Sequence, residues 1–103
     1  MKKDETYVGL DQDMHGGMTD IGRIVRDAQA FGLIPDHETC AGWTAQGIEK
    51  LWERVQQCWR EYGFSVSHFP AELRARYVAL QESAIARARE QGWNPDLDLE
   101  DEA

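Results

Sequence analysis

The sequence has no long hydrophobic run and few cysteines, and these absences exclude several classes of protein. No stretch approaches the ~18–20 consecutive apolar residues that a membrane-spanning helix needs. The N-terminus lacks the basic and then apolar pattern of a secretory signal, so we expect a protein that is not secreted. Two cysteines, Cys40 and Cys58, are too few for the disulfide framework of a small extracellular domain. We therefore expect a cytoplasmic protein with reduced thiols and no membrane partner.

Basic residues are also scarce, with 11 Lys and Arg against 19 Asp and Glu and a net charge of −8. Nucleic-acid-binding proteins take their affinity from Lys and Arg on phosphates, and they show a basic stripe or domain. This sequence has neither, so we expect no nucleic-acid partner. Five of the acids stand in residues 93–103, which we expect to form a disordered acidic tail.

The remaining residues have the composition of one ordinary globular domain. A chain of 103 residues fits a single domain, which we place at residues 1–92. Apolar residues make up 42% and charged residues 29%, as is typical of a soluble protein with one core. Residues 1–18 carry no helical pattern and are expected to form an extended arm and a loop, with Tyr7 and its neighbours lying against the body.

Three segments have the apolar spacing of three and four residues that predicts amphipathic helices, at about 20–31, 45–62 and 70–91. Thr19 and Thr44 precede the first two as N-caps, since a threonine hydroxyl accepts from an amide of the first turn. Short connections favour antiparallel packing of consecutive helices. The predicted fold is therefore all-α, a compact bundle of three main helices. The three apolar stripes are Ile21, Ile24, Val25, Ala28 and Phe31; Ile48, Leu51, Trp52, Val55, Cys58, Trp59 and Tyr62; and Leu73, Tyr77, Leu80, Ala84, Ile85 and Ala88.

Gly22 stands inside the first predicted helix. Glycine there costs ~1 kcal/mol relative to alanine, so a tertiary reason for it is expected. Close packing against another segment and contact with a ligand are both consistent with the sequence.

Cysteine and histidine side chains supply one candidate site, formed by His15, His37 and Cys40. The sequence has no Cys-x₂₋₄-Cys or His-x₃₋₅-His pair, so it lacks a local chelating unit for zinc. Cys40 lies just before the second helix, whose N-terminus favours a thiolate, but Glu38 opposes it. We therefore expect no cofactor and a Cys40 side chain that fills a gap under Trp43. A metal- or thiol-dependent site remains the alternative.

Aromatic residues supply the favoured interpretation, because the chain has four tryptophans. Trp52 and Trp59 are seven residues apart on one face of the second helix and are expected in the core. Aromatic side chains that remain exposed mark interaction sites. The predicted surface contains Trp43 with its loop and the residues Arg23, Arg26 and Trp93. It predicts a non-catalytic interaction or accessory protein whose partner is another protein or a second copy of the chain.

The run from His15 to Ala28 (HGGMTDIGRIVRDA), continued by residues 31–35 (FGLIP) and 40–43 (CAGW), resembles a small bacterial protein family of the proteobacterial type. The family has no assigned activity. The resemblance implies a bacterial cytoplasmic setting, and it implies no cofactor and no catalytic residues.

Overall fold

The computed structural model describes residues 6–93, and this part of the chain is all-helical. It contains α1 (Asp20–Ala30), α2 (Ala45–Glu61) and α3 (Ala71–Glu90), and no strand lies within residues 6–93. The predicted all-α fold with three main helices is confirmed, and each helix end falls within one residue of its predicted position. Three short 3₁₀ turns complete the described elements: η1 (Leu10–Gln12), η2 (Met14–Gly17) and η3 (Val66–His68). The predicted acidic tail beyond Trp93 lies outside the described residues.

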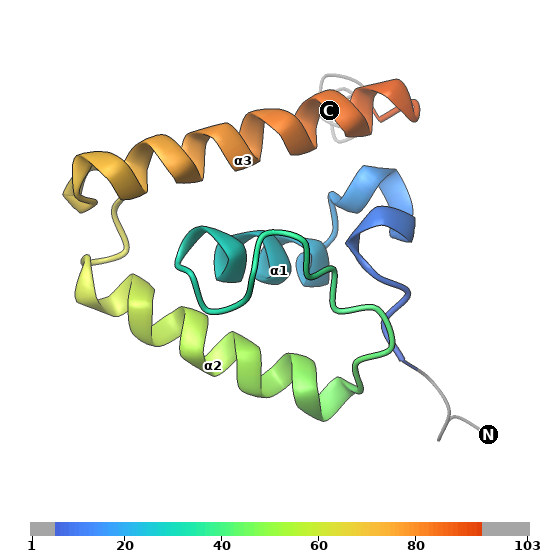
Figure 1. The fold of residues 1–103 in the computed structure, drawn as a ribbon, viewed down its shortest axis with the longest axis horizontal. Helices are drawn as coiled ribbons and strands as arrows, with labels where there is room; N and C mark the ends of the chain where they lie inside the picture. Colours follow the sequence, from blue (N-terminus) through green and yellow to red (C-terminus); the bar gives the residue numbers. More distant parts are fainter. Residues whose placement is uncertain (1–5, 94–103) are drawn as a thin grey trace, which may run out of the picture.

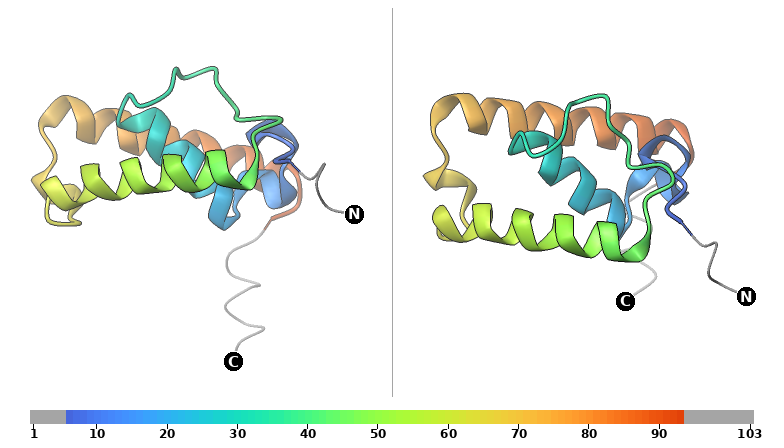
Figure 2. Two further views of the ribbon diagram at one scale, coloured as in Figure 1. Left: turned by 90° about the horizontal axis from the view of Figure 1, so that it is seen from below. Right: turned by 60° about the horizontal axis from the view of Figure 1, so that its bottom comes forward.

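The short helix α1 lies between the longer helices α2 and α3 and packs against both (Figure 1). Figure 2 shows the same order from two other directions, with residues 32–44 crossing beside α1. Because α1 has neighbours on more than one side, its second half is buried all round. Val25 and Ala28 are fully buried, and the polar residues Arg26 and Asp27 are buried with them.

The N-terminal arm pairs with the segment that precedes α2. The Tyr7 amide donates to the Trp43 carbonyl at 2.9 Å, and the Gly42 amide donates back to the Tyr7 carbonyl at 2.8 Å. A third bond runs from the Leu10 amide to the Thr39 carbonyl at 3.0 Å. An extended arm is therefore observed, but residues 11–17, predicted as a loop, form most of the turns η1 and η2.

Both predicted threonine caps are confirmed. The Thr19 hydroxyl accepts from the Gly22 amide at 3.0 Å, and the Thr44 hydroxyl accepts from the Gly47 amide at 3.1 Å. Each hydroxyl satisfies one of the amides that the first turn of a helix leaves without a partner. The helix α3 begins one residue later than predicted, because Pro70 occupies its cap position.

A cluster of aromatic rings joins the three helices at one end of the bundle. The paired ring centroids lie 5.1–6.4 Å apart, mostly in edge-to-face geometry, which aromatic quadrupoles favour. The rings belong to Phe31, Trp59, Tyr62, Phe69 and Tyr77.

Three side chains from the predicted apolar stripes are exposed rather than buried. Trp52, placed in the core by its spacing from Trp59, is 39% exposed, and Ile21 is 38% exposed. Ile85 is exposed as well. Trp52 follows the buried Leu51, and consecutive helix positions differ by about 100° around the axis. Trp52 therefore lies at the edge of the buried face, where the short helix α1 does not cover it.

Within residues 6–93, no helix combines the length and the apolar character that crossing a bilayer requires.

Candidate functional site

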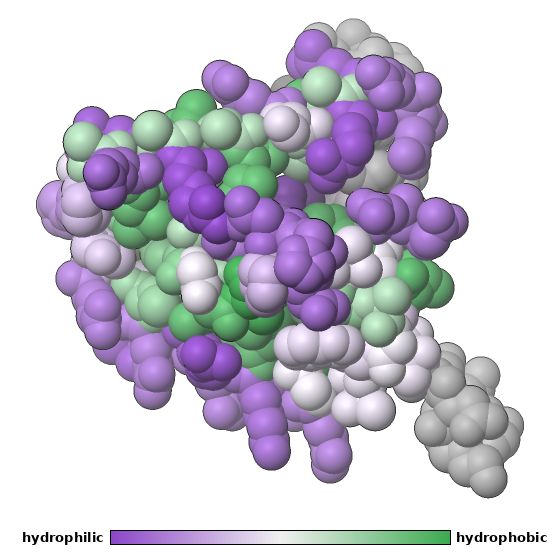
Figure 3. Space-filling view, in the orientation of Figure 1, coloured by the Kyte–Doolittle hydropathy of each residue, from purple (hydrophilic) through white to green (hydrophobic). Residues whose placement is uncertain are grey.

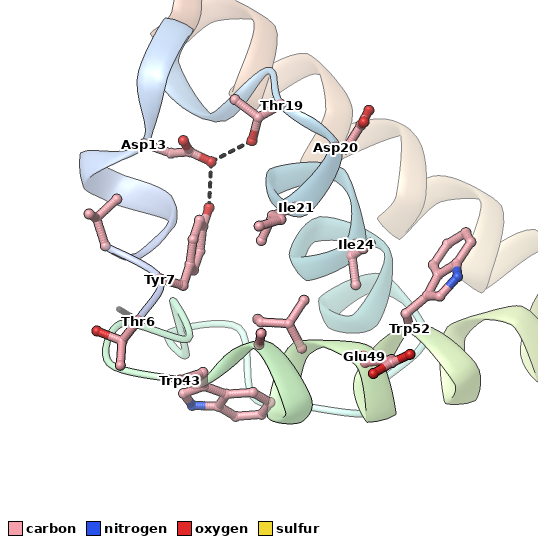
Figure 4. Close-up of a pocket in the computed structure, with 13 residues that line it drawn as sticks. Thr6, Tyr7, Asp13, Thr19, Asp20, Ile21, Ile24, Trp43, Glu49 and Trp52 are labelled. Carbon is pink, nitrogen blue, oxygen red and sulfur yellow. Dashed lines mark hydrogen bonds between the residues drawn. The ribbon is translucent and has the colours of Figure 1, made fainter. Parts of the chain in front are cut away.

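A groove of about 810 Å³ opens between the N-terminal arm, the start of α1 and the first half of α2 (Figure 4). We call it the Trp43–Trp52 groove. Trp43 precedes the Thr44 cap of α2 and Trp52 lies within α2, while Ile21 and Ile24 face the groove from α1. Its apolar lining consists of Tyr7, Val8, Ile21, Ile24, Trp43, Ala45, Ile48 and Trp52.

One end of the groove is fixed by hydrogen bonds to the Asp13 carboxylate. The Tyr7 hydroxyl donates to Asp13 Oδ2 at 2.7 Å, the Thr19 hydroxyl donates to the same oxygen, and the Met14 amide donates to Oδ1. Burial raises the pKa of Tyr7, and the hydrogen bond to Asp13 raises it further, so this phenol stays protonated. Because Thr19 also caps α1, the network ties the arm to that helix and has a structural role.

The edge of the groove is acidic. Asp20 and Glu49 line it and are exposed, whereas the oxygens of Asp13 are already occupied by donors. Among its described lining residues there is no lysine or arginine. In the face shown in Figure 3, hydrophobic side chains remain visible in the middle of the molecule, and hydrophilic ones cover much of its rim. The groove therefore combines an apolar lining with a negative edge, which matches a ligand that is apolar and basic.

Of the residues predicted for a partner surface, only Trp43 lines this groove. Arg23 is exposed but lines a second hollow on the other side of Trp52. Trp93 is half-buried beyond the carboxyl end of α3, where its amide donates to the Ala88 carbonyl at 2.9 Å. The structure thus does not bring the predicted residues together into one surface.

The prediction of Arg26 as a surface residue is wrong, because this side chain is only 6% exposed. Its guanidinium donates to the Gly17 carbonyl at 2.6 Å and to Gln81 Oε1 at 3.1 Å, and so joins η2 and α3 to α1. Burial lowers the pKa of Arg26, and the neighbouring Asp27 charge opposes that shift. The central position of α1 explains the burial, since the side of α1 that carries Arg26 faces α3.

The residues of the alternative metal or thiol site are in different environments. Cys40 is fully buried at a positive φ of 65°, whereas His37 is exposed. Burial, together with the Glu38 charge, raises the pKa of Cys40 to about 11, so its thiol remains protonated near neutral pH. The side chain of His15 lies outside the described part. Within the part that is described, no three His, Cys, Asp or Glu side chains are grouped as metal ligands would be.

Two side chains that line the groove, Tyr7 and Trp52, were not predicted from the sequence as part of a site. Tyr7 reaches it through backbone pairing between segments more than thirty residues apart, which no local pattern reveals. The buried residues of α2 are Ile48, Leu51 and Val55. Trp52 stands one position after Leu51, and this place at the edge of the buried face was the available signal that its side chain is exposed.

Comparison of the chain with models of known protein families, with curated proteins and with solved structures gives no match in any of the three.

Proposed function

We propose that this chain is a non-catalytic interaction protein that binds an apolar and basic segment of another protein in the Trp43–Trp52 groove. The observation that carries the proposal is the exposure of Ile21 and Trp52 beside Trp43 in a groove of about 810 Å³. Exposed apolar side chains gathered in one concave patch are typical of interaction sites, and tryptophan is enriched among the residues that dominate binding energies.

The charge of the groove supports a basic occupant. Asp20 and Glu49 stand at its edge, and a lysine or arginine on the partner would pair with them. The net charge of −8 would attract a basic partner over longer distances. A second copy of the chain would instead bring two acidic edges together. Charge therefore favours a different protein over self-association through this groove.

The three polar groups that join the arm to α1 support a non-catalytic role. Asp13 accepts three hydrogen bonds, and Tyr7 keeps its proton because burial raises its pKa. Thr19 both donates to Asp13 and caps α1. Each of these groups is engaged in holding the arm and the helix together, so none of the three is left free as a nucleophile or a general base.

Two synthetic amphipathic peptides test the proposal. Both carry the same leucine face, and their polar positions are lysine in one and glutamate in the other. We expect the lysine peptide to bind at 0.15 M salt with a Kd of about 10 µM, and the glutamate peptide at least about tenfold more weakly. Titration followed by the indole N–H signals of Trp43 and Trp52 in NMR spectra measures both affinities.

Matched variants separate the groove from the general acidity of the chain. Ile21→Lys places a positive charge in the groove, and Val78→Lys places the same charge on an exposed position of α3 that lines neither hollow. The first should weaken the lysine peptide about tenfold or more, and the second by less than about twofold. Equal losses in both variants would refute binding in the groove. If native mass spectra show that the unaltered protein is a dimer and that the Ile21→Lys variant is a monomer, the groove would be assigned to a second copy of the chain.

A further inference from the structure

A second, smaller hollow of about 340 Å³ lies beside α1, α2 and α3 near the turn that follows α2. Four aromatic side chains line it, and Asp27 and Arg23 from α1 complete most of its wall. We call it the Asp27 pocket. Its aromatic residues are Trp52, Trp59, Phe64 and Tyr77.

Asp27 has a buried carboxylate, and one of its two oxygens accepts no hydrogen bond from residues 6–93. The residue is 5% exposed, and the Trp59 indole N–H donates to Oδ2 at 3.0 Å. Oδ1 is buried too, and no donor within residues 6–93 reaches it. Burial raises the pKa of Asp27, and the Trp59 hydrogen bond and the charges of Arg23 and Arg26 oppose that shift. A buried acceptor without a donor is costly, so a positive charge close to this carboxylate would stabilise it.

The turn that contributes Phe64 to the pocket is also unusual. Phe64 has a φ of 58° and follows Gly63, which has a φ of 64°. A bulky side chain in this left-handed region costs of order 1–3 kcal/mol, and such residues cluster at functional sites. The Phe64 side chain is 59% exposed, although it is one of the pocket's aromatic walls. Its ring is therefore largely in solvent while it lines the pocket.

We propose that the Asp27 pocket binds an organic cation, namely an ammonium or guanidinium group on a short aliphatic stem. The cation would pair with the charge of the Asp27 carboxylate, which lines the pocket, while the aliphatic stem packs against the aromatic walls. Tryptophan and tyrosine rings attract cations through their negative faces, and a nearby carboxylate adds to that attraction. Arg23 at the edge would compete, because it carries the same charge as the ligand. The inference does not rest on the Trp43–Trp52 groove, although Trp52 lines both hollows.

Binding is tested with n-butylammonium chloride, using n-butanol and n-butyrate as neutral and anionic probes of similar size. In 0.15 M salt we expect the Trp59 indole signal to shift with a Kd of about 5 mM, as is reasonable for so few atoms. Butanol and butyrate should bind at least about tenfold more weakly. The indole of Trp93, beyond the carboxyl end of α3, should not move. A Trp59 shift of the same size with butanol, or none with butylammonium, would overturn the proposal.

Three variants test the same site. Asp27→Asn should weaken butylammonium binding about tenfold or more, whereas Glu72→Gln, at an exposed carboxylate of α3 that lines neither hollow, should leave its Kd unchanged. Arg23→Gln should strengthen binding by about two- to fivefold, because it removes the competing charge. Loss of binding in Arg23→Gln, or unchanged binding in Asp27→Asn, would contradict the proposal. Should Asp27→Asn fail to fold, the probe series with the unaltered protein decides.

The source of the cation is distinguished with Nα-acetyl-lysine methylamide, which presents a lysine side chain without charged backbone ends. Binding at least as tight as that of butylammonium assigns the pocket to a basic side chain of a protein. Binding of butylammonium alone assigns it to a free amine. Failure of both probes would refute the cation site while leaving the peptide experiment on the groove unaffected.

Discussion

Gly22→Ala is expected to destabilise the protein by about 3 kcal/mol, although alanine is the better helix former by about 1 kcal/mol. A Cβ atom at Gly22 would lie 2.1 Å from the Gly17 carbonyl oxygen and 2.9 Å from its carbon. These atoms belong to the backbone of η2, so the turn itself would have to move. That movement would also disturb the 2.6 Å bond that Arg26 donates to the same carbonyl. Urea unfolding followed by tryptophan fluorescence measures the loss.

Gly47→Ala is the matched control, because Gly47 holds the same position after its threonine cap in α2. A Cβ atom there meets nothing closer than 3.5 Å, the distance to the Thr44 hydroxyl oxygen. We expect a change between zero and a stabilisation of about 1 kcal/mol. Equal destabilisation by the two substitutions would contradict the close approach of η2 to α1. The structure thus answers the question that the sequence left open, since the space beside Gly22 is occupied by backbone.

Trp59→Phe is expected to destabilise the protein by about 2–3 kcal/mol at pH 7. It removes the indole donor to Asp27 Oδ2 and leaves both oxygens of a buried carboxylate without a donor from residues 6–93. Trp52→Phe makes the same chemical change two turns earlier on α2, at an exposed side chain, and should cost less than about 1 kcal/mol. Chemical unfolding of both variants provides the comparison.

The cost of Trp59→Phe should depend on pH. Burial already raises the pKa of Asp27 in the folded state, and loss of the Trp59 donor raises it further. A group with a raised folded pKa contributes most to stability below its unfolded pKa of 3.8, and this contribution is lost as pH rises through the folded pKa. The difference between Trp59→Phe and the unaltered protein should therefore shrink between pH 7 and pH 4. A difference that stays constant over this range would show that the loss comes from packing alone.

The helices could be predicted from the sequence because their signals are local. Thr19 and Thr44 cap the first two helices as expected, and glycines at positive φ follow the last turns of all three. Each signal depends on residues within one turn of the helix end, so no tertiary knowledge was needed.

The burial of polar residues on α1 could not be predicted in this way. The apolar spacing that predicts an amphipathic helix assigns its polar positions to an exposed face. In the structure, however, α1 has α2 on one side and α3 on the other. Gln29 shows the consequence, since its buried side-chain amide donates to the carbonyls of Asp36 and Glu38 at 3.1 and 2.9 Å. Arg26 is satisfied in the same manner by partners from η2 and α3. These partners lie in other elements, and one sequence gives no sign of them.

The candidate site was also predictable only in its local features. Trp43 was singled out correctly as an aromatic residue that remains partly exposed. The arm that completes the groove is placed by the hydrogen bonds between Tyr7 and residues 42–43, and this pairing is not local. Only the structure brings Trp43, Trp52 and Ile21 together.

Photo-crosslinking from position 52 tests the proposed docking role most directly. The substitution Trp52→p-benzoylphenylalanine is made in the full chain within the cells that produce it, with Val78→p-benzoylphenylalanine as the exposed control on α3. We predict an adduct of one defined mass from position 52 only, to a segment rich in apolar residues and in lysine or arginine. Adding Ile21→Lys should abolish it. Equal adducts from both positions, attachment to an acidic segment, or attachment to a second copy of this chain would contradict the proposed docking role of the groove.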